Sequence, residues 1–182
     1  MGKFIGIAGV LALTVFSNAD AAPTGPYAGQ EQRAIKALSS EEIDSYLSGK
    51  GAGLAKAAEL NHYPGPLHVL ELAETLQLNP QQKARSEAVF KAMQTQAVLV
   101  GKALVDKEQE LDRKFASGAM TSKSLHLLLA QIGKLQAEVR GAHLQAHLDQ
   151  RAILTQEQIA KYDDLRGYTT GNATGHGGHS HH

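Results

Sequence analysis

The chain is 182 residues long, with 42% hydrophobic and only 5% aromatic residues, which suits one small domain with a thin aliphatic core and argues against a bulky enclosed active site. Basic and acidic residues each number 18, so there is no basic surplus for phosphates, and we expect no nucleic-acid partner. Because the chain has no cysteine, helix packing has to hold the fold, and any metal site would use histidine, carboxylate or methionine.

Residues 1–21 have the pattern of a secretory signal peptide. Lys3 precedes an apolar run, and Ala19 and Ala21 fit the small-residue rule for cleavage. We expect cleavage after Ala21 and export to the periplasm. The alternative is an uncleaved membrane anchor, although the apolar run is short for a bilayer span. Residues 22–37 begin with prolines and glycines and are expected to form a flexible N-terminus.

Short helices are expected next in the chain. Ser39 begins a capping-box signature, which predicts a helix over residues 40–47. Residues 54–60 can form another helical turn before a break with two prolines around a glycine. Pro66 suits the first position of a helix over residues 67–76.

Two long helices follow. Asn79 caps the first, which is predicted to end at Gly118, and Thr121 starts the return helix. The first helix has apolar residues at heptad spacing, broken at Lys107 and Glu108: Phe90, Met93, Ala97, Val100, Leu104, Leu111 and Phe115. The return helix has its own seam, with a gap at Asp149: Leu125, Leu128, Ile132, Leu135, Val139, Ala142, Ala146 and Ile153. The predicted fold class is all-α, a long antiparallel helical hairpin with shorter N-terminal helices.

The return helix is predicted to stop and restart at residues 154–158, Leu-Thr-Gln-Glu-Gln. The Thr155 hydroxyl should accept a hydrogen bond from the Gln158 amide, while the Gln158 side chain reaches back to Thr155. Residues 78–82, Leu-Asn-Pro-Gln-Gln, are an imperfect second copy with Asn in place of Thr. The motif residues of the two copies are Leu78, Asn79 and Gln82, and Leu154, Thr155 and Gln158.

The two copies resemble the LTxxQ motif of the Spy/CpxP family of periplasmic chaperones and metal-stress proteins. The resemblance covers residues 38–168, and residues 53–72 are similar to the heavy-metal-sensor branch. It implies a helical domain over residues 38–168 that forms a dimeric cradle. It also implies a metal site built from histidine, glutamate and methionine. The partners it implies are a second copy of the chain, unfolded client proteins, and a periplasmic or membrane signalling protein.

A pair of histidines, His143 and His147, lies one helical turn apart in the return helix. Their Cβ atoms should be about 6 Å apart, close enough to share one ion. Pairing about the loop places Met93 opposite His147 as a third ligand, and His68 or Glu71 completes the shell if the short helix folds back. The expected ion is Zn, Ni or Cu, with no organic cofactor. The alternative is that both histidines cover the border of the apolar seam.

Residues 169–182 contain no apolar residue larger than alanine and are expected to be disordered. Their histidines could capture metal loosely: His176, His179, His181 and His182. We expect His62 and His126 to be solvated, and the adjacent acids Asp163 and Asp164 to lie on a solvated helix face.

The sequence has no nucleophile elbow and no HExxH motif, so no enzymatic activity is expected. The first functional hypothesis is a periplasmic heavy-metal-binding protein that serves metal sensing, buffering or resistance. The alternative is an ATP-independent periplasmic chaperone that holds unfolded proteins during envelope stress.

Overall fold

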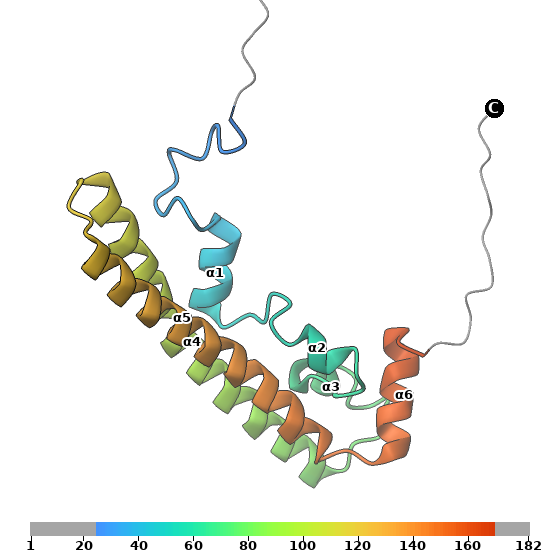
Figure 1. Ribbon diagram of the computed structural model, residues 1–182. Helices are drawn as coiled ribbons and strands as arrows, with labels where there is room; N and C mark the ends of the chain where they lie inside the picture. Colours follow the sequence, from blue (N-terminus) through green and yellow to red (C-terminus); the bar gives the residue numbers. More distant parts are fainter. Residues whose placement is uncertain (1–24, 170–182) are drawn as a thin grey trace, which may run out of the picture. The chain divides into compact units, whose positions relative to one another are not determined.

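The computed structural model describes residues 25–169, and every regular element in that range is an α-helix (Figure 1). The predicted all-α class is therefore confirmed for this part of the chain. Outside it lie the predicted signal peptide, residues 1–21, and the predicted tail ligands His176, His179, His181 and His182. None of the helices within residues 25–169 is long and apolar enough to cross a membrane.

The chain divides into two compact units, residues 1–31 and 32–182. The described part of the first unit, residues 25–31, consists of turns. In the second unit, Ile35 is buried, although it lies upstream of the domain boundary expected at residue 38. The packed domain therefore includes a few residues of the segment expected to be flexible.

The described residues of the second unit form six helices: α1 (Ser40–Ser48), α2 (Lys56–Glu59), α3 (Pro66–Glu71), α4 (Pro80–Ala116), α5 (Ser122–Arg151) and α6 (Gln156–Arg166). Most begin and end within two residues of the expected positions. The main exception is α3, which was predicted to reach residue 76. The chain turns after Glu71 instead, and Leu76 is buried in an apolar cluster with residues of α6. The burial of Leu76 in this cluster thus outweighs the helix propensity of residues 72–76.

The two longest helices, α4 with 37 residues and α5 with 30, lie side by side and run in opposite directions (Figure 1). Residues 117–121 connect them. The short helices pack on this pair, with α1 and α3 against α4, and α2 and α3 against α5. This arrangement brings segments within residues 49–68 next to the part of α5 that carries His143 and His147.

Four helices begin with a reciprocal side-chain cap, in which the cap side chain accepts the amide hydrogen three residues on and that residue's side chain accepts from the cap amide. The caps are Ser39, Asn79, Thr121 and Thr155. Such pairs satisfy amides that have no partner inside a helix. The caps predicted from the sequence at Ser39, Asn79 and Thr155 are confirmed. Because each cap depends on residues three positions apart, the sequence alone predicts where these helices begin.

The two copies of the capping motif meet through their glutamines. Gln82 Nε2 donates to Gln158 Oε1 at 2.8 Å, and Gln158 Nε2 donates to Gln82 Oε1 at 3.1 Å. Each amide also donates to a backbone carbonyl, that of Ile153 for Gln82 and that of Leu76 for Gln158. The start of α4 is therefore joined to the start of α6 by paired amides.

Between α4 and α5 the buried apolar positions are Ala97, Val100, Leu104, Leu128, Ile132, Val139 and Ala146. Two expectations for α4 are wrong. Phe115, predicted in the seam, is 57% exposed, and Glu108, predicted to interrupt it, is buried. At 3.6 residues per turn Phe115 still falls on the same face of α4 as the buried Leu104 and Glu108. Its exposure therefore reflects its place in the last turn of α4 and not a rotation of the buried face.

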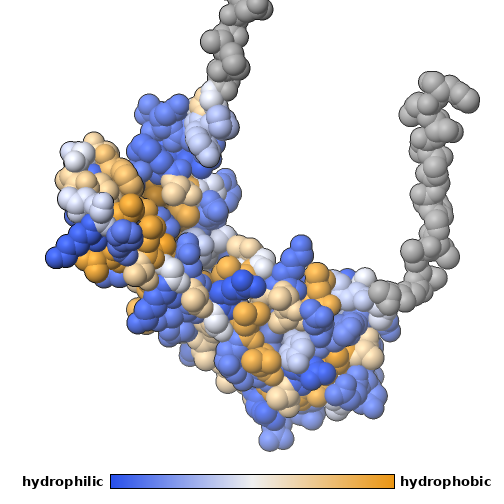
Figure 2. All heavy atoms as spheres, viewed as in Figure 1, coloured by the Kyte–Doolittle hydropathy of each residue, from blue (hydrophilic) through white to orange (hydrophobic). Residues whose placement is uncertain are grey.

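Large apolar side chains also remain exposed on both long helices, among them Leu99, Leu127, Leu129 and Leu148. Figure 2 shows apolar surface interrupted by hydrophilic side chains on the face that it draws. The second unit thus has apolar surface available for contacts.

Candidate metal centre

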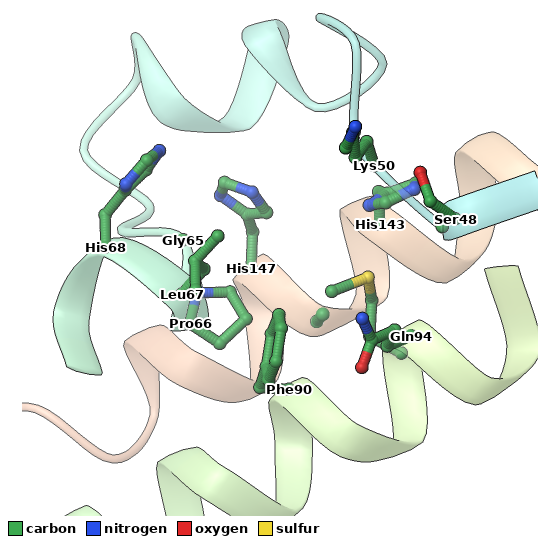
Figure 3. A pocket seen from close by; sticks show the side chains of 14 residues that line it. Ser48, Lys50, Gly65, Pro66, Leu67, His68, Phe90, Gln94, His143 and His147 are labelled. Atoms are coloured by element: carbon green, nitrogen blue, oxygen red, sulfur yellow. The ribbon is translucent and has the colours of Figure 1, made fainter. Parts of the chain in front are cut away.

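A cavity of about 230 Å³ lies between the short helices and the long pair (Figure 3). Four of the five predicted ligands line it: His68 from α3, Met93 from α4, and His143 and His147 from α5. Glu71 is not among the lining residues. The fold therefore brings together side chains from three helices that the sequence analysis had grouped only by hypothesis.

His143 is the most buried of these side chains. The residue is 5% exposed, and its Nε2 atom has no hydrogen-bond partner among the described residues. Burial lowers the pKa of its imidazole, and the neighbouring His147 lowers it further, so the ring is uncharged at pH 7 and keeps a lone pair. Gly51, in the turn after α1, packs over the ring. A Cβ atom on Gly51 would stand 3.6 Å from His143 Nδ1.

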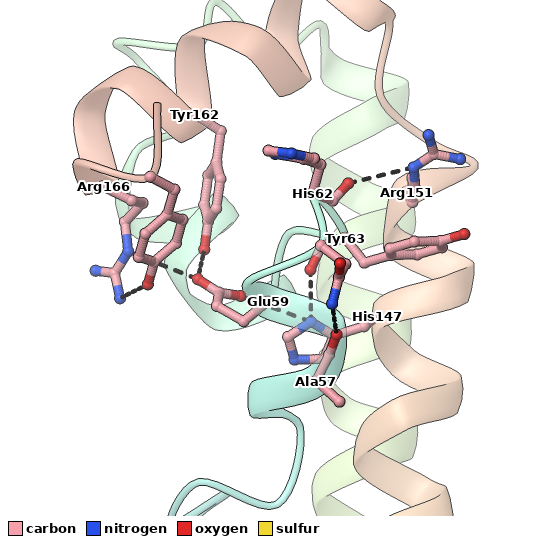
Figure 4. A network of polar contacts seen from close by, with 10 residues as sticks. Ala57, Glu59, His62, Tyr63, His147, Arg151, Tyr162 and Arg166 are labelled. Carbon is pink, nitrogen blue, oxygen red and sulfur yellow. Dashed lines mark hydrogen bonds and ion pairs between the residues drawn. The ribbon is translucent and has the colours of Figure 1, made fainter. Parts of the chain in front are cut away.

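His147 is oriented by the backbone. Its Nδ1 lies 2.7 Å from the carbonyl oxygen of Tyr63, and because a carbonyl only accepts, Nδ1 carries the hydrogen (Figure 4). In the neutral ring this leaves the Nε2 lone pair free. Metal-binding histidines typically donate their other nitrogen to a carbonyl or carboxylate in this way.

Space beside that nitrogen comes from Gly65, at the N-terminus of α3. A Cβ atom built on Gly65 would lie 3.3 Å from His147 Nε2 and 3.4 Å from Glu59 Oε2. The missing side chain therefore leaves a gap between a histidine nitrogen and a carboxylate oxygen.

Glu59, at the end of α2, is the site residue that the sequence analysis missed. Its Oε2 atom is buried, has no hydrogen-bond partner among the described residues, and lies 3.6 Å from His147 Nδ1. Its Oε1 atom accepts from the Tyr162 hydroxyl at 2.5 Å (Figure 4). Burial and the hydrogen bond to Glu59 raise the pKa of Tyr162, so the phenol stays protonated and donates. The only sequence signal was a carboxylate just before the proline-glycine break.

His68 and Glu71 contact each other, with His68 Nδ1 2.8 Å from Glu71 Oε2. Glu71 thus contacts His68 and not the cavity. His68 also lines a second cavity of about 370 Å³, which it shares with Glu59, His143 and His147. Met93 lines the first of these two cavities and not the second, so the two offer different donor sets around one histidine pair.

The ligands do not yet surround a common point. Within residues 25–169, no three histidine, aspartate or glutamate side chains stand close enough together to hold a metal ion. The residues nevertheless fit a metal, because two buried donor atoms, His143 Nε2 and Glu59 Oε2, have no hydrogen-bond partner among the described residues. Binding an ion requires His143, His147 and Glu59 to close toward each other.

His62 is exposed, as expected, and it also contacts α6. Its Nδ1 lies 2.8 Å from Oδ2 of Asp163, a buried residue. The expectation that Asp163 lies on a solvated face is wrong, because α6 turns this side chain toward residues 61–63. His126 is exposed, as expected. This contact ties α6 to the segment that also orients His147.

Comparison with family models, curated proteins and solved structures gives no match to this chain. The resemblance to the Spy/CpxP family therefore depends on the residues of the two capping motifs and on the segment before the first of them.

Proposed function

We propose that this protein is a periplasmic heavy-metal-binding protein that serves metal sensing, buffering or resistance, and that it takes one transition-metal ion beside α5. The observation that carries the proposal is the buried, uncharged His143, whose Nε2 has no hydrogen-bond partner among the described residues. Leaving such a group unsatisfied costs about 1–3 kcal/mol. A metal ion held jointly with His147 would remove that cost.

The donor types suit Zn, Ni or Cu. Imidazole nitrogens suit all three, and a thioether such as Met93 adds affinity for Cu(I). His147, oriented by the Tyr63 carbonyl, is the ligand closest to a binding geometry. The role proposed is binding without a catalytic step, in a chain that is exported after cleavage at Ala21 and pairs as a homodimer. The long helical pair would then belong to a Spy/CpxP-like fold.

Native mass spectrometry with Zn(II), Ni(II) and Cu(I) tests this proposal on the chain from residue 22 and on a version ending at Tyr168, which lacks the histidine tail. We expect the shorter version to retain one ion per chain and to lose it in the double variant His143→Ala, His147→Ala. His126→Ala, an exposed histidine on the same helix, is the matched control and should bind normally. A shorter version that binds no ion would contradict the proposal.

A second candidate function is an ATP-independent chaperone. The exposed leucines on α4 and α5, interspersed with charged residues, favour it because such surfaces can hold unfolded chains (Figure 2). Light scattering of a reduced, aggregating client, with metal-free and metal-loaded protein side by side, tests it. Equal aggregation with and without the protein in both states would leave metal binding alone.

A further inference from the structure

Helix α6 reaches the candidate metal centre through one carboxylate. Glu59 Oε1 accepts from the Tyr162 hydroxyl and lies 3.7 Å from Arg166 Nε, and both partners belong to α6. Glu59 Oε2 has no hydrogen-bond partner among the described residues and lies on the side of His147 (Figure 4). The two oxygens of one side chain therefore face two different parts of the molecule.

Tyr162 is held firmly in this position. Its side chain is fully buried in the apolar cluster that joins α6 to the rest of the domain, with Val69, Leu76, Leu154 and Ile159. Because this packing fixes the ring, the Tyr162 oxygen stands at a fixed position beside Glu59 Oε1. The position of Glu59 thus depends on α6 being docked.

We propose that Glu59 is the carboxylate ligand of the metal centre and that Tyr162 is its positioning residue, so that metal binding and the docking of α6 stabilise each other. This inference rests on the proposed metal-binding function and adds a ligand and a responding element to it. A carboxylate with two imidazoles favours a divalent ion over Cu(I). The ion would enter the gap left by Gly65 between His147 and Glu59.

The coupling follows from linkage. A hydrogen bond from a neighbouring residue that orients a metal ligand typically contributes about 10–100-fold to metal affinity. If docked α6 raises the affinity for the ion by this route, the ion must favour docked α6 by the same factor. Arg166 Nε lies near Glu59 Oε1, so the guanidinium group does not block Glu59 Oε2, the oxygen that would bind the ion.

Calorimetric titration of the chain from residue 22 with Zn(II) tests the ligand assignment. In Glu59→Gln the amide carbonyl can still accept from Tyr162, but the nitrogen that replaces Oε2 does not bind metal. Tyr162→Phe keeps the ring in the cluster and removes only the hydroxyl. We expect Glu59→Gln to lose at least about 100-fold in affinity and Tyr162→Phe about 10-fold. Glu87→Gln, an exposed carboxylate on α4, is the control and should not change.

Hydrogen exchange of the α6 amides tests the coupling itself. Zn(II) should slow exchange in α6 of the unaltered protein, and this metal-dependent slowing should be absent in Glu59→Gln even where metal-free exchange is normal. If Tyr162→Phe loses helical circular dichroism, Glu59→Gln decides the outcome alone.

The possible failures are distinguishable. If the folded, unaltered protein binds no Zn(II), the proposed function fails and the inference with it. If it binds Zn(II) through His143 and His147, yet Glu59→Gln binds equally well and α6 exchange does not respond, only the inference is overturned.

Discussion

At the scale of single residues, the candidate metal centre depends on atoms that are buried without a partner and on a missing side chain. His143 Nε2 and Glu59 Oε2 have no hydrogen-bond partner among the described residues, and Gly65 leaves a gap beside His147. Each of the two unpartnered atoms carries a cost in the metal-free protein that an ion would offset.

Replacing Gly65 by alanine should weaken metal binding without unfolding the protein. The backbone of Gly65 has φ −79° and ψ 139°, which alanine adopts without strain. The added methyl group would stand 3.1 Å from His147 Cε1 and fill the gap beside Nε2. We expect at least about a tenfold loss of Zn(II) affinity by calorimetry, since a displaced ligand commonly costs that much. Unchanged affinity would show that the ion does not use this gap.

The metal-free protein should lose stability as the pH falls below about 6.5, the pKa of an unfolded histidine. Burial lowers the pKa of His143 in the folded state, so below this pH the unfolded chain binds a proton that the folded chain rejects. Above it both states are neutral and the contribution is zero. Urea unfolding at pH 7.5 and 5.5 should therefore show a drop that is smaller in His143→Gln, by up to about 1 kcal/mol. An identical drop in both proteins would contradict the effect.

At the scale of the elements, the helix ends are held by local caps, but the caps are connected by tertiary contacts. Gln82 and Gln158 each complete a capping box at their own helix and also donate to each other. One side chain thus serves both the local start of a helix and its position against another helix. This double role makes the pair more sensitive to substitution than an ordinary cap.

A double-mutant cycle on Gln82 and Gln158 tests that connection. Replacing either by alanine removes a cap and leaves the other amide without its partner, so each should lower the free energy of unfolding by about 1–3 kcal/mol. Because the second substitution removes a group that is already unpaired, the double variant should lose less than the sum, by about 1 kcal/mol. Gln156→Ala, exposed in the first turn of α6, is the control. Strict additivity would argue that the two caps act independently.

At the scale of the whole described domain, the short helices are placed by close approach to the long pair. Gly101 in α4 lies under α1, where an added Cβ atom would overlap the backbone carbonyl of Tyr46. Only a residue without a side chain lets the two helices come this near. The close approach of α1 to α4, and with it the position of the glycine-rich turn that follows over His143, therefore requires glycine at residue 101.

Alanine at Gly101 should destabilise the protein although alanine favours helices. At a helix position with open space around it, replacing glycine by alanine raises the free energy of unfolding by about 0.5–1 kcal/mol. We expect this for Gly133→Ala, because a Cβ atom added at Gly133 would have no neighbour within 4 Å. Gly101→Ala should instead lower the free energy of unfolding and speed hydrogen exchange in α1, because α1 has to move away. Urea unfolding of the two variants measures the contrast. Stabilisation by both substitutions would refute the close approach.

Local chemistry alone determined the helical class, the helix starts and the adjacency of the histidine pair. A cap such as Thr155 with Gln158 is settled by residues three positions apart, and His143 and His147 meet by helical periodicity. These features involve short separations along the chain, so their signals are present in the sequence itself.

Only the tertiary structure decided which residues far away in the sequence contact the helix caps and the histidine pair. Glu59 lies 88 positions before His147, and the pairing of Gln82 with Gln158 spans 76. The burial of His143 and the exposure of Phe115 likewise depend on which segments cover each face of the long pair. Contacts of this kind arise from the packing of whole elements, so no periodicity or spacing in the sequence specifies them.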